Sequence, residues 1–192
     1  MSTLFTIESE FLLWVQSWRQ GRLNKIICPI THLADGGAMW IAVALLLLIV
    51  GYVRMKKGRG TDMLRVGAMC AAAMLLTLLV VNVLIKPLAA RTRPYDAIDG
   101  LVSLVGRESD FSFPSGHSAN SFSCAWAIFR GTKKKYGIPA LILAALISLS
   151  RLYVGVHYPS DVICGVIIGI VMSEIGVRIV KKLFDKKQIV RR

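Results

Sequence analysis

Two uncharged stretches decide the fold: GGAMWIAVALLLLIVGYV at residues 36–53 and VGAMCAAAMLLTLLVVNVLI at residues 66–85. The first is 18 residues long and the second is 20. Both approach the roughly 20 apolar residues that a helix needs to cross about 30 Å of hydrocarbon. We therefore predict a transmembrane helix over each stretch.

Three later segments are also rich in apolar residues, although they are shorter or interrupted: residues 118–129, 136–150 and 162–180. We predict that they complete a set of five transmembrane helices. The expected fold class is all-α, an integral membrane helical bundle. Its 192 residues form a single domain, with an N-terminal segment at 1–35, a transmembrane core at 36–180 and a basic tail at 181–192.

The N-terminal segment has a different pattern. Its apolar residues alternate with polar ones at roughly helical spacing, beginning with Phe5, Leu12, Leu13, Val15 and Trp18. This spacing predicts an amphipathic helix in the membrane interface, and Ile26, Ile27 and Ile30 indicate a second one. A sixth span within residues 3–33 is the alternative, but the basic residues at 19, 22 and 25 would make it costly.

The basic residues indicate the orientation. Lysine and arginine number 24 against 11 acidic residues, a net charge of +13, and most of them gather at 54–65, 130–135 and 178–192. Five spans place all three clusters on one side, which the positive-inside rule assigns to the cytoplasm together with the C-terminus. Because these charges flank spans instead of interleaving with aromatic stacking residues, we predict no nucleic-acid partner.

The opposite side holds fewer cations. Five of them lie in two connections, and these connections carry three short strings. The strings are KPLAARTRP at 86–94, FPSGHS at 113–118 and SRLYVGVHYPSD at 150–161. Pro94 favours an extended residue before it, and Pro159 suits the first turn of a helix. The loop before residue 115 is also longer than most connections, and long loops are often functional.

The residue types in these strings suit a phosphoryl group. Its transfer needs neutralisation of the charge on the equatorial oxygens, which we expect from Lys86, Arg93 and Arg151. The backbone N–H groups of Ser115, Gly116 and His117 are expected to point towards the anion from a helix N-terminus.

The two histidines and one carboxylate complete the chemistry. A neutral His157 can attack phosphorus if Asp161, four residues later, holds its other ring N–H, and His117 can protonate the leaving oxygen. Cationic side chains supply the neutralisation and the carboxylates are few and scattered. We therefore predict no metal and no other cofactor.

These strings resemble the type 2 phosphatidic acid phosphatase family, whose pattern is K-x6-RP, then PSGH, then SR-x5-H-x3-D. The match runs from Lys86 to Asp161. The resemblance implies that His157 forms a phosphohistidine, Asp161 orients it and His117 is the general acid. It also implies metal-independent hydrolysis and a phosphate site made of Lys86, Arg93, Ser115, Gly116 and Arg151.

Other charged residues of the same connection fall outside the motif. Arg91 is interpreted as a loop cation. The acidic residues are interpreted as solvated loop positions, namely Asp96, Asp99, Glu108 and Asp110.

The resemblance implies a multi-pass cell-membrane enzyme whose site faces the extracytoplasmic side and takes a phospholipid or isoprenoid phosphate from the bilayer. Undecaprenyl pyrophosphate is the favoured substrate, because an outward site suits recycling of a carrier lipid. Phosphatidylglycerophosphate and phosphatidic acid are alternatives. A protein that binds or transports anionic lipid without hydrolysis is the alternative of another class. The oligomeric state is left open.

Overall fold

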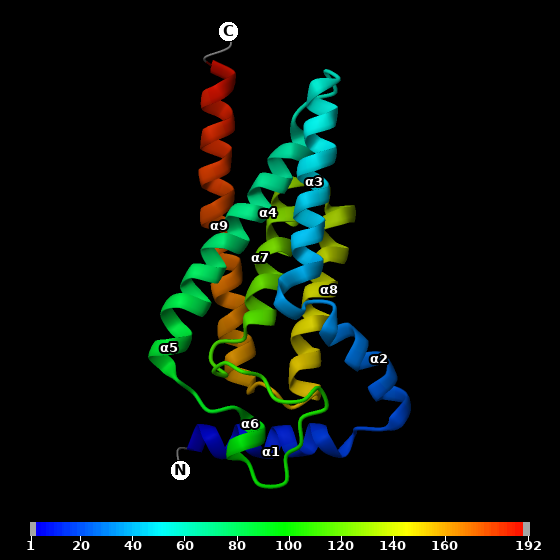
Figure 1. Cartoon of the computed structure of the whole chain (residues 1–192), viewed down its shortest axis with the longest axis vertical. Coiled ribbons are helices and arrows are strands. Elements are labelled where there is room, and N and C mark those ends of the chain that lie inside the picture. Colours follow the sequence, from blue (N-terminus) through cyan, green and yellow to red (C-terminus); the bar gives the residue numbers. More distant parts are fainter. Residues whose placement is uncertain (1–2, 190–192) are drawn as a thin grey trace.

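The computed structural model describes residues 3–189, which contain helices and loops and no strand. Residues 1–2 and residues 190–192 of the predicted basic tail lie outside the described part. Five long helices run alongside one another (Figure 1): α3 (Ala38–Lys56), α4 (Asp62–Leu78), α7 (Gly116–Gly131), α8 (Lys134–Tyr153) and α9 (Pro159–Ile189). A π-helix, η2 (Leu79–Ile85), extends α4 into the short α5 (Lys86–Ala89).

Four helical segments are long and apolar enough to cross a membrane: residues 35–56, 62–97, 134–153 and 159–186. The fifth predicted span, α7, has only 16 residues. It packs against α4, α8 and α9 in the interior of the bundle, and this explains why it contains buried serines. One of them, Ser121, accepts a hydrogen bond of 2.9 Å from the indole N–H of Trp40 on α3. The predicted all-α membrane bundle is confirmed.

The N-terminal segment forms the two predicted helices, α1 (Thr3–Ser17) and α2 (Gly21–His32). With 15 and 12 residues, both are shorter than a membrane span, so the sixth-span alternative is not supported. Helix α1 lies across the end of the bundle (Figure 1) and buries Glu8 and Leu12 there.

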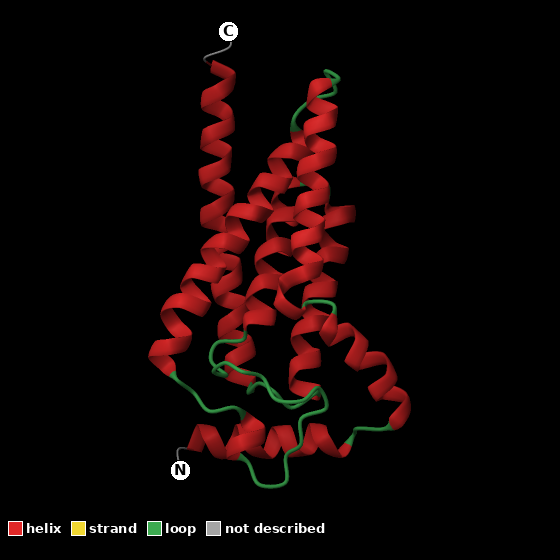
Figure 2. Ribbon diagram, viewed as in Figure 1, coloured by secondary structure: helices red, strands yellow, loops and turns green. Residues whose placement is uncertain are grey.

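The two ends of the bundle differ in what they carry. The α3–α4 turn and the C-terminal end of α9 lie at one end, away from α1 (Figure 1). The long connection between the short α6 (Pro94–Ala97) and α7 lies at the other end, beside α1 (Figure 2). The predicted basic cluster at 54–65 and the described part of the cluster at 178–192 thus sit at the end opposite the long motif-bearing connection.

Helices α7 and α9 approach closely because α9 carries glycines four residues apart. A Cβ atom built on Gly165 would lie 2.6 Å from the carbonyl oxygen of Ser115, and one on Gly169 would lie 2.3 Å from that of Ala119. Small residues at this spacing allow membrane helices to pack backbone against backbone. The contact holds the start of α7 against the first turns of α9, where two of the three motifs lie.

We expect Gly169→Ala to lower the free energy of unfolding by about 1–3 kcal/mol, because the added methyl group overpacks a backbone contact. Gly21→Ala is the matched control, since nothing lies within 4 Å of a Cβ atom there. Thermal unfolding of both variants in detergent measures the difference. Equal melting temperatures would contradict the proposed close packing.

Candidate functional site

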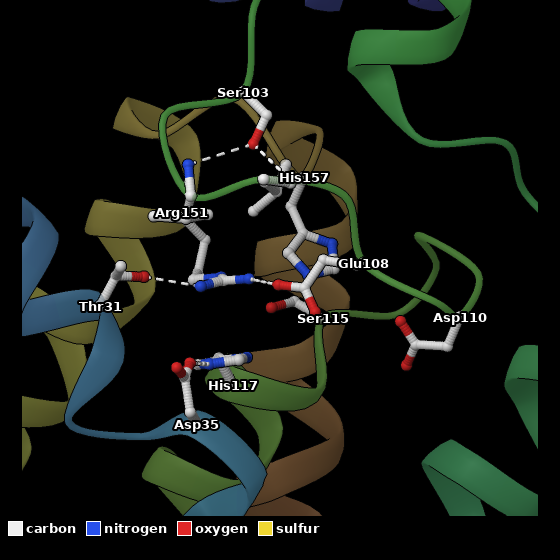
Figure 3. A network of polar contacts seen from close by, with 12 residues as sticks. Thr31, Asp35, Ser103, Glu108, Asp110, Ser115, His117, Arg151 and His157 are labelled. Carbon is white, nitrogen blue, oxygen red and sulfur yellow. Dashed lines mark hydrogen bonds and ion pairs between the residues drawn. The ribbon is translucent and has the colours of Figure 1, made fainter.

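The bundle brings the three motifs together at the end covered by α1. Lys86 is the first residue of α5, and Arg93 directly precedes α6 with the extended backbone expected before Pro94 (φ −69°, ψ 149°). A cavity of about 250 Å³ is lined by five of the predicted site residues, namely Lys86, Arg93, Gly116, His117 and His157. A smaller cavity of about 170 Å³ is lined by Arg151, and His117 and Glu108 border both (Figure 3).

His157 lies in the turn between α8 and α9 and is only 1% exposed. Its Nδ1 is 3.4 Å from Oδ2 of Asp161, and its Nε2 is 3.2 Å from Nη1 of Arg93. A guanidinium can only donate, so Nε2 is the acceptor and the ring proton sits on Nδ1, facing the carboxylate. Burial lowers the pKa of His157 to about 3, against the opposing effect of Asp161, so the imidazole is neutral at pH 7.

Asp161, in the first turn of α9, is fully buried and held by several donors. Its Oδ2 accepts hydrogen bonds from the Ser112 hydroxyl and, at 2.9 Å, from the backbone N–H of Tyr158. Its Oδ1 accepts one of 2.6 Å from Nη1 of Arg91. The interpretation of Arg91 as a loop cation is therefore wrong, because this guanidinium is part of the Asp161 environment.

His117, in the first turn of α7, faces a carboxylate that the motifs do not include. Its Nε2 is 2.9 Å from Oδ1 of Asp35, and the other oxygen of Asp35 is 2.7 Å from Nδ1 of His32 (Figure 3). The only sequence signal for Asp35 is an acidic residue next to the predicted entrance of a span. Without the fold, nothing links it to a histidine 82 residues later.

The three cations are engaged by loop carboxylates. Lys86 and Arg93 both form ion pairs with Asp110, and Arg151 forms one with Glu108 (Figure 3). Glu108 and Asp110 lie in the loop with side chains 31% and 44% exposed, but their interpretation as merely solvated residues is wrong, because both pair with site cations. Burial by itself would raise the pKa of Asp110, but the Lys86 hydrogen bond and the two cations lower it below its usual value, so this carboxylate is ionised.

The remaining acidic residues of the connection lie apart from Lys86, Arg93 and Arg151. Asp96 pairs with Arg107 at 2.7 Å, and Asp99 is exposed.

Thr31 of α2, which no motif indicated, accepts a hydrogen bond of 2.7 Å from Nη1 of Arg151.

Ser115 and Gly116 lie at the start of α7. The backbone N–H of Ser115 donates to the carbonyl oxygen of Asp161 at 3.0 Å, so the prediction that it points towards an anion is wrong. The Ser115 side chain instead caps α7 by accepting from the N–H of Ser118 at 3.3 Å. Gly116 lines the larger cavity, where a Cβ atom would lie 3.8 Å from Nζ of Lys86.

Comparison with known proteins agrees with this geometry. A family model described as PAP2 superfamily matches residues 66–185. An undecaprenyl-diphosphatase of Sulfolobus acidocaldarius is 31% identical over 73% of this chain and 63% of its own. Phosphatidylglycerophosphatase B of Bacillus subtilis is 31% identical over 80% of this chain and 73% of its own.

Solved structures are similar over almost the whole chain. The crystal structure of a transmembrane PAP2 type phosphatidylglycerolphosphate phosphatase from Bacillus subtilis has a TM-score of 0.71 and 27% identity. The match covers 97% of this chain and 88% of that one. Against the first four curated relatives, by contrast, this chain spans between 39% and 73% of their length.

Proposed function

The chain belongs to the PAP2 superfamily, and on that premise we propose that it is a membrane lipid phosphatase acting through a phosphohistidine. The observation that carries this proposal is the state of His157. A neutral imidazole, with Nδ1 towards Asp161, borders a cavity that Lys86 and Arg93 also line, and its Nε2 accepts a hydrogen bond from Arg93. When a phosphate takes over the Arg93 guanidinium, the Nε2 lone pair becomes available for attack. This combination suits nucleophilic attack on an anionic phosphorus centre.

The proposed reaction has two steps. In the first, Nε2 of His157 forms a bond to phosphorus, the bond from phosphorus to the leaving oxygen breaks, and the protonated form of His117 donates its proton to that oxygen. Burial and the neighbouring Arg151 lower the pKa of His117 to about 4 in the structure, so the step requires that the bound phosphate anion stabilises the protonated form. In the second, His117 takes a proton from water, and the water oxygen forms a bond to phosphorus. The bond from phosphorus to Nε2 breaks, so phosphate and free His157 are released. Asp161 holds the ring proton on Nδ1 throughout and stabilises the positive charge that develops on the imidazole.

The phosphate oxygens are proposed to bind to Lys86, Arg93 and Arg151 and to the backbone of Gly116. Ser115 is proposed to contribute by fixing the start of α7. To bind, the substrate must displace the carboxylates of Asp110 and Glu108, which pair with these cations in the structure. A group with more negative charge competes better for cations that are already paired. This supports a diphosphate as the substrate.

Within the lipid phosphates we propose undecaprenyl pyrophosphate, with phosphatidylglycerophosphate and phosphatidic acid as alternatives. The name of the Sulfolobus relative supports the first and that of the Bacillus relative supports the second. We also propose that the site faces the extracytoplasmic side. The long motif-bearing connection lies at the end of the bundle opposite the basic α3–α4 turn (Figure 1), which the positive-inside rule assigns to the cytoplasm.

Phosphate release by the purified protein in excess EDTA tests the proposal. The substrates are undecaprenyl pyrophosphate, phosphatidylglycerophosphate and phosphatidic acid, presented in the same detergent micelles. We expect release from all or some of them, fastest from the diphosphate. Binding of these lipids without any release would contradict the proposal and favour the non-hydrolytic alternative.

Asp110→Asn tests the competition between carboxylate and substrate. Removing this charge frees Lys86 and Arg93, so we expect orthovanadate to inhibit about tenfold more tightly, which corresponds to about 1.4 kcal/mol. Asp99→Asn is the control, because Asp99 is an exposed carboxylate of the same connection. Unchanged or weaker inhibition of Asp110→Asn would show that the ion pairs do not oppose anion binding.

A further inference from the structure

A buried carboxylate on the N-terminal helix lies outside all three motifs. Glu8 of α1 is only 3% exposed, and both of its oxygens have partners. Oε1 accepts a hydrogen bond of 2.8 Å from the backbone N–H of Ser160, in the first turn of α9. Oε2 accepts one of 2.6 Å from Nη2 of Arg91. A buried charge of this kind is retained only where it is paired, and here the pairing leads towards the site.

Arg91 connects Glu8 to Asp161. Its Nη2 contacts Glu8, while its Nη1 donates to Oδ1 of Asp161 at 2.6 Å and to the Ser160 hydroxyl at 2.7 Å. Its guanidinium carbon lies 3.7 Å from the ring centroid of Tyr158, so the planar group is also fixed by stacking. The contacts form a continuous chain from Glu8 through Arg91 and Asp161 to His157.

We infer that Glu8 and Arg91 are positioning residues for the nucleophile, which makes helix α1 part of the catalytic apparatus. The inference rests on the proposed function. Neither residue lines the cavity beside His157, so neither is placed to touch a substrate phosphate. Their effect passes through Asp161.

The two oxygens of Asp161 have different partners, and this difference explains how Glu8 and Arg91 affect His157. Oδ2 receives Ser112, the N–H of Tyr158 and Nδ1 of His157. The hydrogen bond to Oδ1, among the described residues, comes from Arg91. Without this bond the carboxylate is free to rotate, and Oδ2 no longer stays aligned with His157. Groups that orient metal-binding side chains typically change activity by about 10- to 100-fold when they are removed, and we expect an effect of this size here.

Helix α1 is suited to hold Glu8 in place from the membrane surface. It exposes an apolar stripe with residues three and four positions apart, Leu4, Ile7, Phe11 and Trp14, which Trp18 continues just after the helix. Such a stripe, rich in tryptophan, anchors a helix in the interface. On a neighbouring face Leu12 is fully buried, one turn after Glu8. Anchoring of α1 and orientation of Asp161 are thereby combined in one helix.

The test is a double-mutant cycle in the full-length protein. Glu8→Gln and Arg91→Met are made in the wild type and in an Asp161→Asn background, and kcat and KM are measured with the lipid substrate. In the wild type we expect kcat to fall about 10-fold for Glu8→Gln and about 100-fold for Arg91→Met, with KM unchanged. In the Asp161→Asn background we expect neither change to lower kcat by more than about twofold, because the residue they act through is already altered.

Three variants separate positioning from folding. In Glu8→Gln the new side chain has the same shape and keeps an oxygen for the N–H of Ser160. The substitution therefore removes the negative charge and keeps the hydrogen bond to the first turn of α9. Glu10→Gln is the matched control, since Glu10 is exposed on the same helix and is expected to leave kcat unchanged. Arg91→Lys is expected to restore part of the activity lost in Arg91→Met, because a lysine supplies the charge but not two parallel donors.

Two results would overturn the inference: a wild-type kcat for Glu8→Gln, or an equal loss of kcat in both backgrounds, which is the behaviour of a structural role. Failure of the proposed function has a different signature. In that case the wild-type protein itself releases no phosphate from any lipid, and the cycle has no rate to compare.

Discussion

His157→Ala is expected to lower kcat for lipid phosphate hydrolysis by at least about 1000-fold, because it removes the group that forms the covalent intermediate. The imidazole Nε2 is the nucleophile in this account, and the residues that line the cavity beside it hold the phosphate without being able to replace it. KM is expected to change little, since Lys86 and Arg93 remain. Measurement of phosphate release over hours in detergent gives the required sensitivity.

Loss of folding must be separated from loss of the nucleophile, because His157 is buried. Thermal unfolding and retained binding of orthovanadate show whether the His157→Ala protein keeps the site. Added imidazole provides a second control, since it can enter the vacated space and attack phosphorus itself. A folded His157→Ala protein with more than one tenth of the wild-type rate would remove His157 from the nucleophilic role.

His117→Gln is expected to have the second-largest effect, a decrease in kcat of about 100- to 10,000-fold with a lipid substrate. The imidazole of His117 is the proposed proton donor to the leaving oxygen, and Asp35 holds it at 2.9 Å. Glutamine preserves a hydrogen-bonding group of similar reach but cannot transfer a proton. The effect therefore reports general acid catalysis and not the loss of a contact.

The leaving group provides a direct check of this role. p-Nitrophenyl phosphate releases an oxygen that needs little protonation, so the loss caused by His117→Gln is expected to be far smaller with this substrate than with a lipid phosphate. His32→Gln is a suitable comparison, because His32 also contacts Asp35 but lies outside the motif. Equal losses with both substrates would show that His117 acts in some way other than protonation of the leaving group.

The transmembrane bundle was predictable because hydrophobicity marks long lipid-facing helices. The stretches at 36–53 and 66–85 correspond to α3 and to α4 with η2. Even the interior helix α7 was found, although its 16 residues include serines that a lipid-facing helix would not contain. The predicted site residues are specified by short strings with fixed spacing, and the structure brings five of them to one cavity.

The partners of these residues were not predictable in the same way. Glu8 lies 83 residues from Arg91, and Glu108 lies 43 residues from Arg151, so neither pair has a periodic or local signal. The sequence pattern around an acidic residue in a polar loop is the same whether the residue faces water or a buried cation. Only the packing of α1 and of the long connection over the bundle end distinguishes the two.

Detection of a phosphoryl group on His157 would show the covalent intermediate itself. The purified protein is mixed with lipid substrate carrying labelled phosphorus and quenched in alkali within milliseconds, and its peptides are analysed by mass spectrometry. We expect a phosphoryl group on His157 that is stable in alkali, labile in acid and absent from the His157→Ala variant. Rapid phosphate release by the wild type with no labelled His157 at any time would contradict the account.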